Sequence, residues 1–353
     1  MSELRWRLAD DDGGQGALFE QEVERHIGRG EFRGMEFLHV QARRVINEVP
    51  KASRMPFRWT INAYRGCSHA CSYCFARPTH EYLGMNTGED FDRRIVVKVN
   101  AVERVRAELA PGRWAGAHIA MGTNTDPYQR CEGKYRLTQG IVGQLSSAAN
   151  PFSILTKSTL IMRDLDLLAE AARRTEVRAN FSIGTLDEEV WRLTEPGTPH
   201  PLRRVEAVAK LNEAGVPCGV LVAPILPGLS DGPEQLDAVV KACVEAGAVA
   251  VTPLLLHLRP GVREHYMDWL AGARPDLLEH YAGLYPRAYA PARTQDALAT
   301  TVRQLVARHG GRSAGPRQTR SVKAEPAASA PPAVSQLQLG VQEMTPVADL
   351  PQR

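Results

Sequence analysis

Short apolar runs alternate along the chain with longer segments in which apolar residues recur at helical spacing. The short runs are rich in β-branched and aromatic residues and predict six strands. We place these strands at residues 57–63, 118–122, 152–156, 177–183, 218–225 and 248–256. The longer segments predict helices over residues 101–109, 137–149, 165–172 and 202–214, and a further helix that starts at Asp231. Strand residues 154–155 and 220–222 are apolar throughout, which is typical of a parallel sheet covered on its face.

The helix that starts at Asp231 has the clearest apolar stripe. Glu234 lies three residues further on, the spacing of a capping box, and Gly247 ends the helix. The stripe consists of Leu236, Val239, Val240, Cys243 and Val244. Strands that alternate with helices in this way predict an α/β fold, and six of them predict an open (β/α)6 barrel rather than a closed eight-fold one. The chemistry of such barrels lies at the C-terminal ends of the strands.

The two ends of the chain differ from this pattern. Residues 1–50 are polar and interrupted by glycines, and predict an N-terminal extension with one short strand and turn, from residues 37–40 and 45–46. Helical patterns over residues 262–285 and 294–309 predict helices that flank the barrel domain of residues 51–310. Residues 311–353 are dominated by Pro, Ala, Ser and Gln, and we expect this tail to be disordered because it has too little apolar surface to bury.

Composition limits the function only loosely. The 353 residues carry a formal net charge of +3, which neither requires nor excludes a nucleic-acid partner. Of the 6 cysteines, Cys131, Cys218 and Cys243 are isolated, so the pattern is not a disulfide framework and suits a reducing compartment. We find no signal-peptide pattern and no apolar run long enough to span a bilayer. We therefore expect a cytoplasmic protein.

The strongest chemical signal follows the first predicted strand. Cys67, Cys71 and Cys74 have the spacing Cys-x-x-x-Cys-x-x-Cys, and Gly66 together with small intervening residues allows the backbone to wrap around one centre. Structural iron–sulfur and zinc sites take four protein ligands, so three cysteines leave one metal position open. A zinc site with His69 or His80 as fourth ligand also fits the local residues.

This spacing, with aromatic Tyr73 before the last cysteine, resembles the signature of radical S-adenosylmethionine enzymes. The resemblance implies a partial TIM barrel with flanking N- and C-terminal helices. It also implies a 4Fe-4S cluster held by the three cysteines, with S-adenosylmethionine chelating the fourth iron. The implied reaction is reductive cleavage of S-adenosylmethionine to a 5′-deoxyadenosyl radical, which abstracts hydrogen from a substrate. An electron donor of the flavodoxin or ferredoxin type is implied as partner.

Further motifs resemble the branch of that family related to spore photoproduct lyase, whose members are often described as DNA repair photolyases. These motifs are residues 125–129 and Glu132 after the second strand, residues 155–158 after the third, Ser182 in the fourth, and residues 195–196. Residues 122–124 stand where other members of the superfamily have a glycine-rich strand motif.

The resemblance implies a role for each matched residue toward S-adenosylmethionine. Thr125 and Asp126 would approach its amine, Lys157 would pair with its carboxylate, and Ser182 would hydrogen-bond the carboxylate or ribose. Tyr73 belongs to the same cofactor-binding group. A carboxylate beside an ammonium and a lysine beside a carboxylate are charge-assisted contacts that suit a site sheltered from water.

Several assignments stay open at this point. Cys131 is a candidate hydrogen donor because a thiol S–H bond is weak, or else a small residue tolerated in a loop. Cys218 and Cys243 are expected to be packing residues. His257 and Arg259 could reach the substrate or lie on the rim.

The sequence leaves the substrate open as well. The arginine pairs at residues 93–94 and 203–204 could contact phosphates or belong to solvated faces. A DNA photolesion is the nearest precedent for the substrate. Modification of a protein, peptide or metabolite, and a non-catalytic iron–sulfur or zinc module, are the alternatives.

Overall fold

The computed structural model describes residues 19–50, 53 and 55–313. The predicted disordered tail therefore lies, from residue 314 onward, outside the described residues. No helix in the described part of the chain combines the length and the apolar character that a membrane crossing requires.

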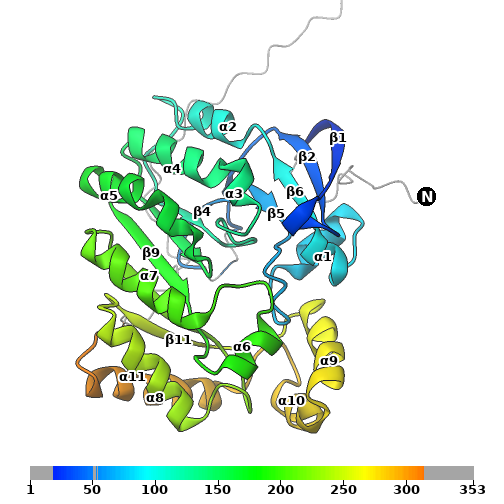
Figure 1. Cartoon of the computed structure of the whole chain (residues 1–353), viewed down its shortest axis with the longest axis vertical. Coiled ribbons are helices and arrows are strands. Elements are labelled where there is room, and N and C mark those ends of the chain that lie inside the picture. The colour runs from blue at the N-terminus through cyan, green and yellow to red at the C-terminus, as the bar shows by residue number, and fades with distance from the viewer. Residues whose placement is uncertain (1–18, 51–52, 54, 314–353) are drawn as a thin grey trace, which may run out of the picture.

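The larger of two sheets has the strand order β11-β10-β9-β8-β7-β4-β3 (Figure 1). Neighbouring strands from β4 to β11 are parallel, and β3 joins the edge antiparallel to β4. The strands are β3 (Ile46–Glu48), β4 (Trp59–Ile61), β7 (Ile119–Met121), β8 (Phe152–Thr156), β9 (Val177–Ser182), β10 (Cys218–Ile225) and β11 (Val251–Leu255). The edge strands β11 and β3 are not paired with each other in this sheet. The predicted open barrel with six parallel strands is confirmed.

Helices connect the parallel strands and pack on the outside of the sheet (Figure 1). They are α2 (Ala101–Glu108), α4 (Leu137–Ser147), α5 (Leu165–Arg174), α7 (Pro201–Glu213), α8 (Pro233–Glu245) and α11 (Ala292–Arg308). The predicted capping box of α8 is wrong. Gly232 is the N-cap residue, and the Asp231 carboxylate instead accepts a hydrogen bond from the Gly228 amide at 2.8 Å. The apolar stripe of α8 is nevertheless buried as predicted.

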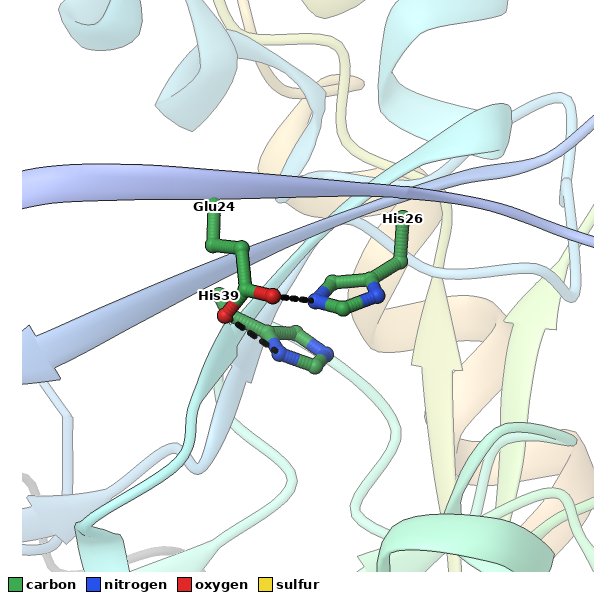
Figure 2. A group of neighbouring side chains, drawn as sticks. All are labelled: Glu24, His26 and His39. Carbon is green, nitrogen blue, oxygen red and sulfur yellow. Dashed lines mark ion pairs between the residues drawn. The ribbon is translucent and has the colours of Figure 1, made fainter.

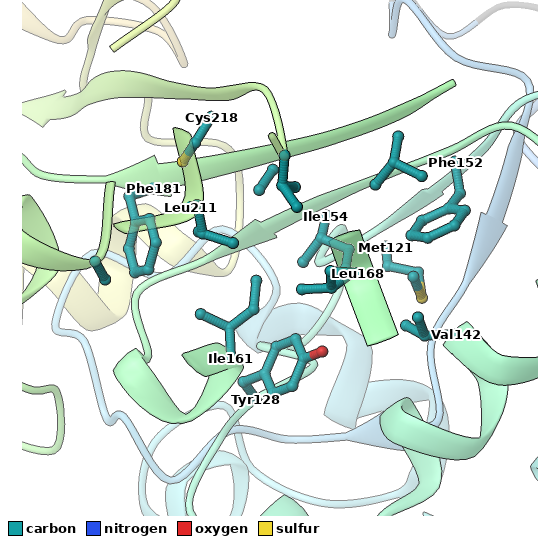
Figure 3. Packing of buried hydrophobic residues seen from close by; sticks show 14 of the residues in the cluster. Met121, Tyr128, Val142, Phe152, Ile154, Ile161, Leu168, Phe181, Leu211 and Cys218 are labelled. Atoms are coloured by element: carbon teal, nitrogen blue, oxygen red, sulfur yellow. The ribbon is translucent and has the colours of Figure 1, made fainter. Parts of the chain in front are cut away.

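Alternation along the strands separates the core from the site. Phe152, Ile154 and Phe181 point toward the helices and belong to the main apolar core, which Figure 3 shows at close range. Because successive strand residues face opposite sides of a sheet, Leu155 and Ser182 face the concave side. The core also contains Cys218 and Cys243, both fully buried, in keeping with the packing role that we expected of them.

The N-terminal segment differs from the prediction. Where we expected one short strand and turn with flanking helices, its described residues form three strands and a short 3-10 helix, η1 (Gly30–Phe32), but no α-helix. Strands β1 (Phe19–Ile27) and β2 (Glu36–Ala42) combine with β6 (Arg94–Lys98) and β5 (Tyr64–Arg65) in a second sheet of order β1-β2-β6-β5. The sequence pattern missed β1 because an edge strand with many solvent-facing residues has no long apolar run.

Shorter elements complete the fold. The long helix predicted after β11 is divided at Pro275, because the proline ring is incompatible with a helix interior. The helices on either side of Pro275 do follow the parallel strands in the chain, as predicted. The segments are α9 (Val262–Ala273), η4 (Pro275–Leu277) and α10 (Leu278–Leu284). The sequence pattern did not predict η2 (Arg77–Leu83), α1 (Glu89–Arg93), α3 (Glu132–Tyr135), η3 (Thr159–Asp164) or α6 (Glu188–Thr194).

The strand ends pack closely at the residue that follows β7, and a substitution there tests this packing. Gly122 has φ +89°, and a Cβ added there would lie 2.0 Å from the carbonyl oxygen of Leu155. Gly122→Ala should lower the free energy of unfolding by at least about 2 kcal/mol, because it adds backbone strain to a clash with backbone. Gly143→Ala in α4 is the matched control, since its Cβ would meet nothing within 4 Å, and it should stabilise by about 0.5–1 kcal/mol. Equal effects in urea unfolding would contradict this account.

Candidate active site

One cavity opens at the carboxyl ends of the parallel strands. Cys67, Cys71 and Cys74 belong to its wall, and residues 122–126 and 155–157 line it from the ends of β7 and β8. The lining includes every residue that the sequence predicts for the cofactor, namely Tyr73, Thr125, Asp126, Lys157 and Ser182. Much of the remaining wall is apolar, and His257 lies on it, whereas Arg259 does not.

The loop that carries the cysteines begins with Gly66, which leaves no room for a side chain. Its φ is +79°, and an added Cβ would lie 2.8 Å from the carbonyl oxygen of Phe91. The Gly66 carbonyl accepts hydrogen bonds from the Thr125 hydroxyl at 2.6 Å and from Nε2 of Gln129 at 3.0 Å. Oε1 of Gln129 accepts in turn from the Ser68 amide at 3.0 Å. The loop after β7 therefore holds the start of the cysteine loop.

Arg77 holds the middle of the cysteine loop. Its guanidinium is 1% exposed and donates to the carbonyl oxygen of Cys71, from Nε at 3.2 Å and from Nη2 at 2.9 Å. The same Nη2 donates to Asp92 at 2.9 Å, and Nη1 donates to the carbonyls of Thr87 and Gly88. Burial raises the pKa of Asp92 to about 6, although Arg77 acts in the opposite direction.

Backbone contacts with the segment after α6 hold the far side of the cysteine loop. The Ser72 amide donates to the carbonyl oxygen of Thr194 at 3.0 Å, and the Gly197 amide donates to that of His69 at 3.0 Å. Gly197 allows this approach, since a Cβ there would lie 2.2 Å from the Ser68 carbonyl oxygen. The cysteine loop is thus fixed from three sides.

The chemistry and spacing of the three thiols fit a cluster better than a single zinc ion. Burial raises the pKa of Cys67, Cys71 and Cys74, so the cavity keeps the free thiols protonated. Among the described residues, these sulfurs belong to no group of three ligand atoms that all lie within 4.8 Å of one another. Tetrahedral zinc with Zn–S bonds of about 2.3 Å would place sulfurs about 3.8 Å apart.

The two histidines considered as a fourth zinc ligand are placed differently. His69 lines the cavity, and its Nδ1 faces the Asp126 carboxylate at 3.4 Å. Nε2 of His80 lies 3.0 Å from the Arg94 carbonyl oxygen, and His80 is not part of the cavity wall. The soft donors of the cavity wall are the three thiols, and three thiols with an open metal position suit an iron–sulfur cluster.

Asp126 connects the loop after β7 to the end of β8. Its carboxylate accepts hydrogen bonds from the Thr156 hydroxyl at 2.7 Å, the Lys157 amide at 2.7 Å and the Tyr128 amide at 2.9 Å. Burial alone would raise the pKa of Asp126, but His69 and these hydrogen bonds outweigh burial and lower it. Both oxygens thus have partners within the chain, which makes Asp126 a fixed negative charge in the cavity wall.

A buried ionic cluster lies beside the thiols. Nζ of Lys157 donates to the Ser182 hydroxyl at 2.6 Å, lies 3.3 Å from Oε1 of Glu195, and is 5.6 Å from the centre of the Tyr73 ring. Glu195 also pairs with Arg204 at 2.5 Å and accepts a hydrogen bond from the Tyr73 hydroxyl. Burial opposes ionisation of Glu195, but Arg204 and Lys157 overcome it and lower its pKa to about 2.

The ionic cluster contradicts the hypothesis that Arg204 contacts a phosphate. Arg204 is 1% exposed and is bound to Glu195, so it cannot reach a phosphate at the surface. Arg203, Arg93 and Arg94 also have carboxylate partners, Glu206 at 3.1 Å, Glu89 at 2.7 Å and Glu36 at 3.1 Å, respectively.

Cys131 is the predicted site residue that the structure places elsewhere. Its side chain is fully buried in the main core and does not line the cavity. The neighbouring Glu132 explains this, because its buried carboxylate accepts hydrogen bonds from the Tyr64 hydroxyl and, at 2.9 Å, from Arg163. These contacts draw the segment into the core. The placement does not support a hydrogen-donor role for Cys131.

Sequence reasoning missed three residues that organise the site. Gln129 and Glu195 lie within motifs that we noted, but no role followed from the sequence because their partners are distant in the chain. Arg77, three residues after the last cysteine, offered no signal beyond its proximity. At the rim, His257 stacks on Tyr289 with ring centres 5.4 Å apart.

Glu195 provides a test of the ionic cluster. Glu195→Gln should lower the free energy of unfolding by roughly 3–5 kcal/mol at neutral pH, because Arg204 and Lys157 lose a buried counter-charge. The folded-state pKa is depressed, so this contribution is present above the ordinary glutamate pKa of 4.5 and is lost as the pH falls toward 2. Urea unfolding of wild type and variant across this range should show the difference shrinking.

The matched control is Glu206→Gln, which breaks the exposed pair with Arg203. Its effect should stay below about 1 kcal/mol at every pH. A Glu195→Gln difference as small as that of the control would remove the ionic cluster from the account.

Comparison with known proteins places the chain in a family. Residues 61–241 match the Radical SAM superfamily. The chain is 45% identical over 300 residues to uncharacterized protein Rv2578c of Mycobacterium tuberculosis strain H37Rv, covering 85% of this chain and 88% of the relative. It is 29% identical over 199 residues to uncharacterized protein MJ0683 of Methanocaldococcus jannaschii, covering 56% of this chain and 70% of that relative.

A solved structure shares the fold. Spore photoproduct lyase complexed with a dinucleoside spore photoproduct superposes with a TM-score of 0.56 at 20% sequence identity, over 77% of this chain and 79% of that one. The fold, the site and the family match agree with the resemblance drawn from the cysteine motif. The chain is an enzyme that belongs to the radical S-adenosylmethionine superfamily.

Proposed function

We propose that Cys67, Cys71 and Cys74 hold a 4Fe-4S cluster and that S-adenosylmethionine binds beside it in the cavity. The observation that carries this proposal is that three cysteines and one lysine line a single cavity at the strand ends. When bound, the cluster and S-adenosylmethionine supply a 5′-deoxyadenosyl radical after one-electron reduction, and this radical abstracts hydrogen from the substrate. Enzymes of this class need a reductant, for which we propose a protein of the flavodoxin or ferredoxin type.

The residues of the chain bind and shield the reacting groups. Lys157, 14% exposed at its side chain, is the cation available to the carboxylate of S-adenosylmethionine, and Ser182 offers a hydroxyl beside it. The partners that Lys157 already has, Ser182, Glu195 and the Ala223 carbonyl, hold its ammonium in position before the ligand arrives. We assign Thr125, Asp126 and Tyr73 to the surrounding wall, where Asp126 keeps a negative charge for the amine. Apolar strand ends such as Leu155 and Leu221 exclude water.

For the substrate we propose a planar, ring-containing molecule, with a DNA photolesion as the first to test. The support is the pair of His257 and Phe75 in the cavity wall, with ring centres 6.2 Å apart, since flat rings stack on such side chains. The ion pairs of Arg93, Arg94 and Arg203 give no comparable support for phosphate binding. Modification of a protein, peptide or metabolite is the alternative outcome when a lesion-bearing oligonucleotide is not converted.

The cysteine triad gives the first test of this function. After anaerobic reconstitution, wild type should contain about four irons with matching sulfide, and Cys71→Ala should lose most of both. Cys218→Ala is the matched control, because Cys218 lies in the apolar core, and it should keep its iron. One zinc and no iron in wild type would establish the non-catalytic module instead. With dithionite and S-adenosylmethionine, only the iron-loaded proteins should form 5′-deoxyadenosine, which mass spectrometry detects.

Lys157 tests the cofactor assignment separately from the cluster. Lys157→Ala should weaken the binding of S-adenosylmethionine by roughly 10–100-fold, the effect of one lost charge-assisted hydrogen bond, while iron content stays at the wild-type level. Lys210→Ala, an exposed lysine on α7, is the control and should bind normally. A titration of the reconstituted proteins measures both. Unchanged affinity in Lys157→Ala would exclude the proposed carboxylate contact.

A further inference from the structure

A second group of metal-ligating side chains lies outside the cysteine cavity, on the sheet β1-β2-β6-β5. Glu24 and His26 are two residues apart on β1 and therefore face the same side of the sheet. His39 lies directly opposite Glu24 on β2, in antiparallel register. Residues paired in this way have Cβ atoms about 5 Å apart. The strand pairing alone thus brings one carboxylate and two imidazoles together, as Figure 2 shows.

The distances within this group suit one metal ion. One ligand atom from each residue can be chosen such that all three lie within 4.8 Å of one another. Nε2 of His26 lies 2.9 Å from Oε1 of Glu24, and Nδ1 of His39 lies 4.0 Å from Oε2 (Figure 2). Around a tetrahedral ion with bonds of about 2.0 Å, ligand atoms stand about 3.3 Å apart, and the two observed distances bracket this value.

A buried nitrogen in this group lacks a hydrogen bond. Nε2 of His26 is buried and forms none, although it lies close to the Glu24 carboxylate. Its contact with Glu24 at 2.9 Å is an ion pair without hydrogen-bond geometry, so the nitrogen is only partly satisfied. The rings of His26 and His39 are neighbours, with centres 3.9 Å apart. Among the described residues, no further histidine or carboxylate belongs to this group. A cation between them would satisfy the nitrogen and the carboxylate together.

His39 is oriented for binding through Nδ1. Its other nitrogen, Nε2, lies 2.8 Å from the Tyr135 hydroxyl of α3, and a histidine that ligates a metal usually uses its second nitrogen in such a contact.

We propose that Glu24, His26 and His39 bind one divalent transition-metal ion of the zinc class, with an open coordination position toward solvent. Two imidazoles and a carboxylate are a donor set that zinc accepts with water as fourth ligand. The Glu24 side chain is 72% exposed, so ions and water reach the site directly. The ion would join the edge strand β1 to β2. This site is independent of the cysteine cavity and does not rest on the function proposed there.

Zinc binding to untagged full-length protein tests the proposal. The cluster is reconstituted first, so that the cysteine thiols are occupied, and the protein is then dialysed against Zn²⁺ and its zinc content measured by mass spectrometry. Wild type should retain about one zinc per chain, and binding should raise its melting temperature by a few degrees. Glu24→Gln and His39→Ala should each lose the zinc and the thermal shift. Tyr135→Phe should weaken binding roughly 10–100-fold by removing the contact to His39.

His309→Ala is the matched control. His309 also pairs with a carboxylate, that of Asp237 at 2.9 Å, but the described residues supply no third ligand there, so this variant should keep its zinc. Iron content confirms that each variant is folded, and Glu24→Gln changes an exposed side chain without altering its size. Zinc absent from wild type, or retained equally by Glu24→Gln and His39→Ala, would overturn the proposal.

Discussion

The site depends on an irregular loop that is held in a fixed conformation, because this loop brings three cysteines to one cavity. Residues 66–76 contain no helix or strand, so their backbone groups cannot satisfy one another as those of a regular element do. Side chains supply the missing partners: Gln129 and Thr125 bind the carbonyl of Gly66, and Arg77 binds that of Cys71. Each of these hydrogen bonds is buried, where leaving a carbonyl without a donor costs about 1–3 kcal/mol. The geometry of the cysteine loop therefore depends on side chains that are not metal ligands.

The buried ionic cluster also holds the cysteine loop, because it joins that loop to other segments of the barrel. Glu195 follows α6, Arg204 lies on α7 and Lys157 follows β8, so one carboxylate joins the α6–α7 segment to the end of a strand distant in the sequence. The Tyr73 hydroxyl adds the cysteine loop to this group. Within this cluster, two cations for one buried carboxylate leave a positive excess on the side of Lys157. An anionic group that enters there meets a charge already oriented by its neighbours, which lowers the cost of ordering on binding.

The sequence predicted well what depends on local pattern. The six parallel strands follow from apolar runs, and the spacing of Cys67, Cys71 and Cys74 pointed to the correct family because those residues must converge over a short stretch of chain. What it could not predict depends on distant partners. Arg77 is buried because of Asp92 and the carbonyls near it, and Cys131 is buried because Glu132 binds Tyr64 and Arg163. No periodicity encodes such pairs. Strands β1 and β6 were missed for a related reason, since strand identity at an exposed edge depends on the neighbour it pairs with.

The second sheet links the histidine group to the start of the cysteine loop. His39 on β2 is in register with Val97 on β6, and Val97 is in register with Tyr64 on β5, two residues before Gly66. Two residues of α3 contact this row of paired strand residues: Tyr135 contacts His39, and Glu132 contacts Tyr64. Strand β1 forms one edge of this sheet and pairs with β2 alone. An ion bound across β1 and β2 would stabilise the sheet at this edge, and the same sheet carries the backbone into the cysteine loop through β5.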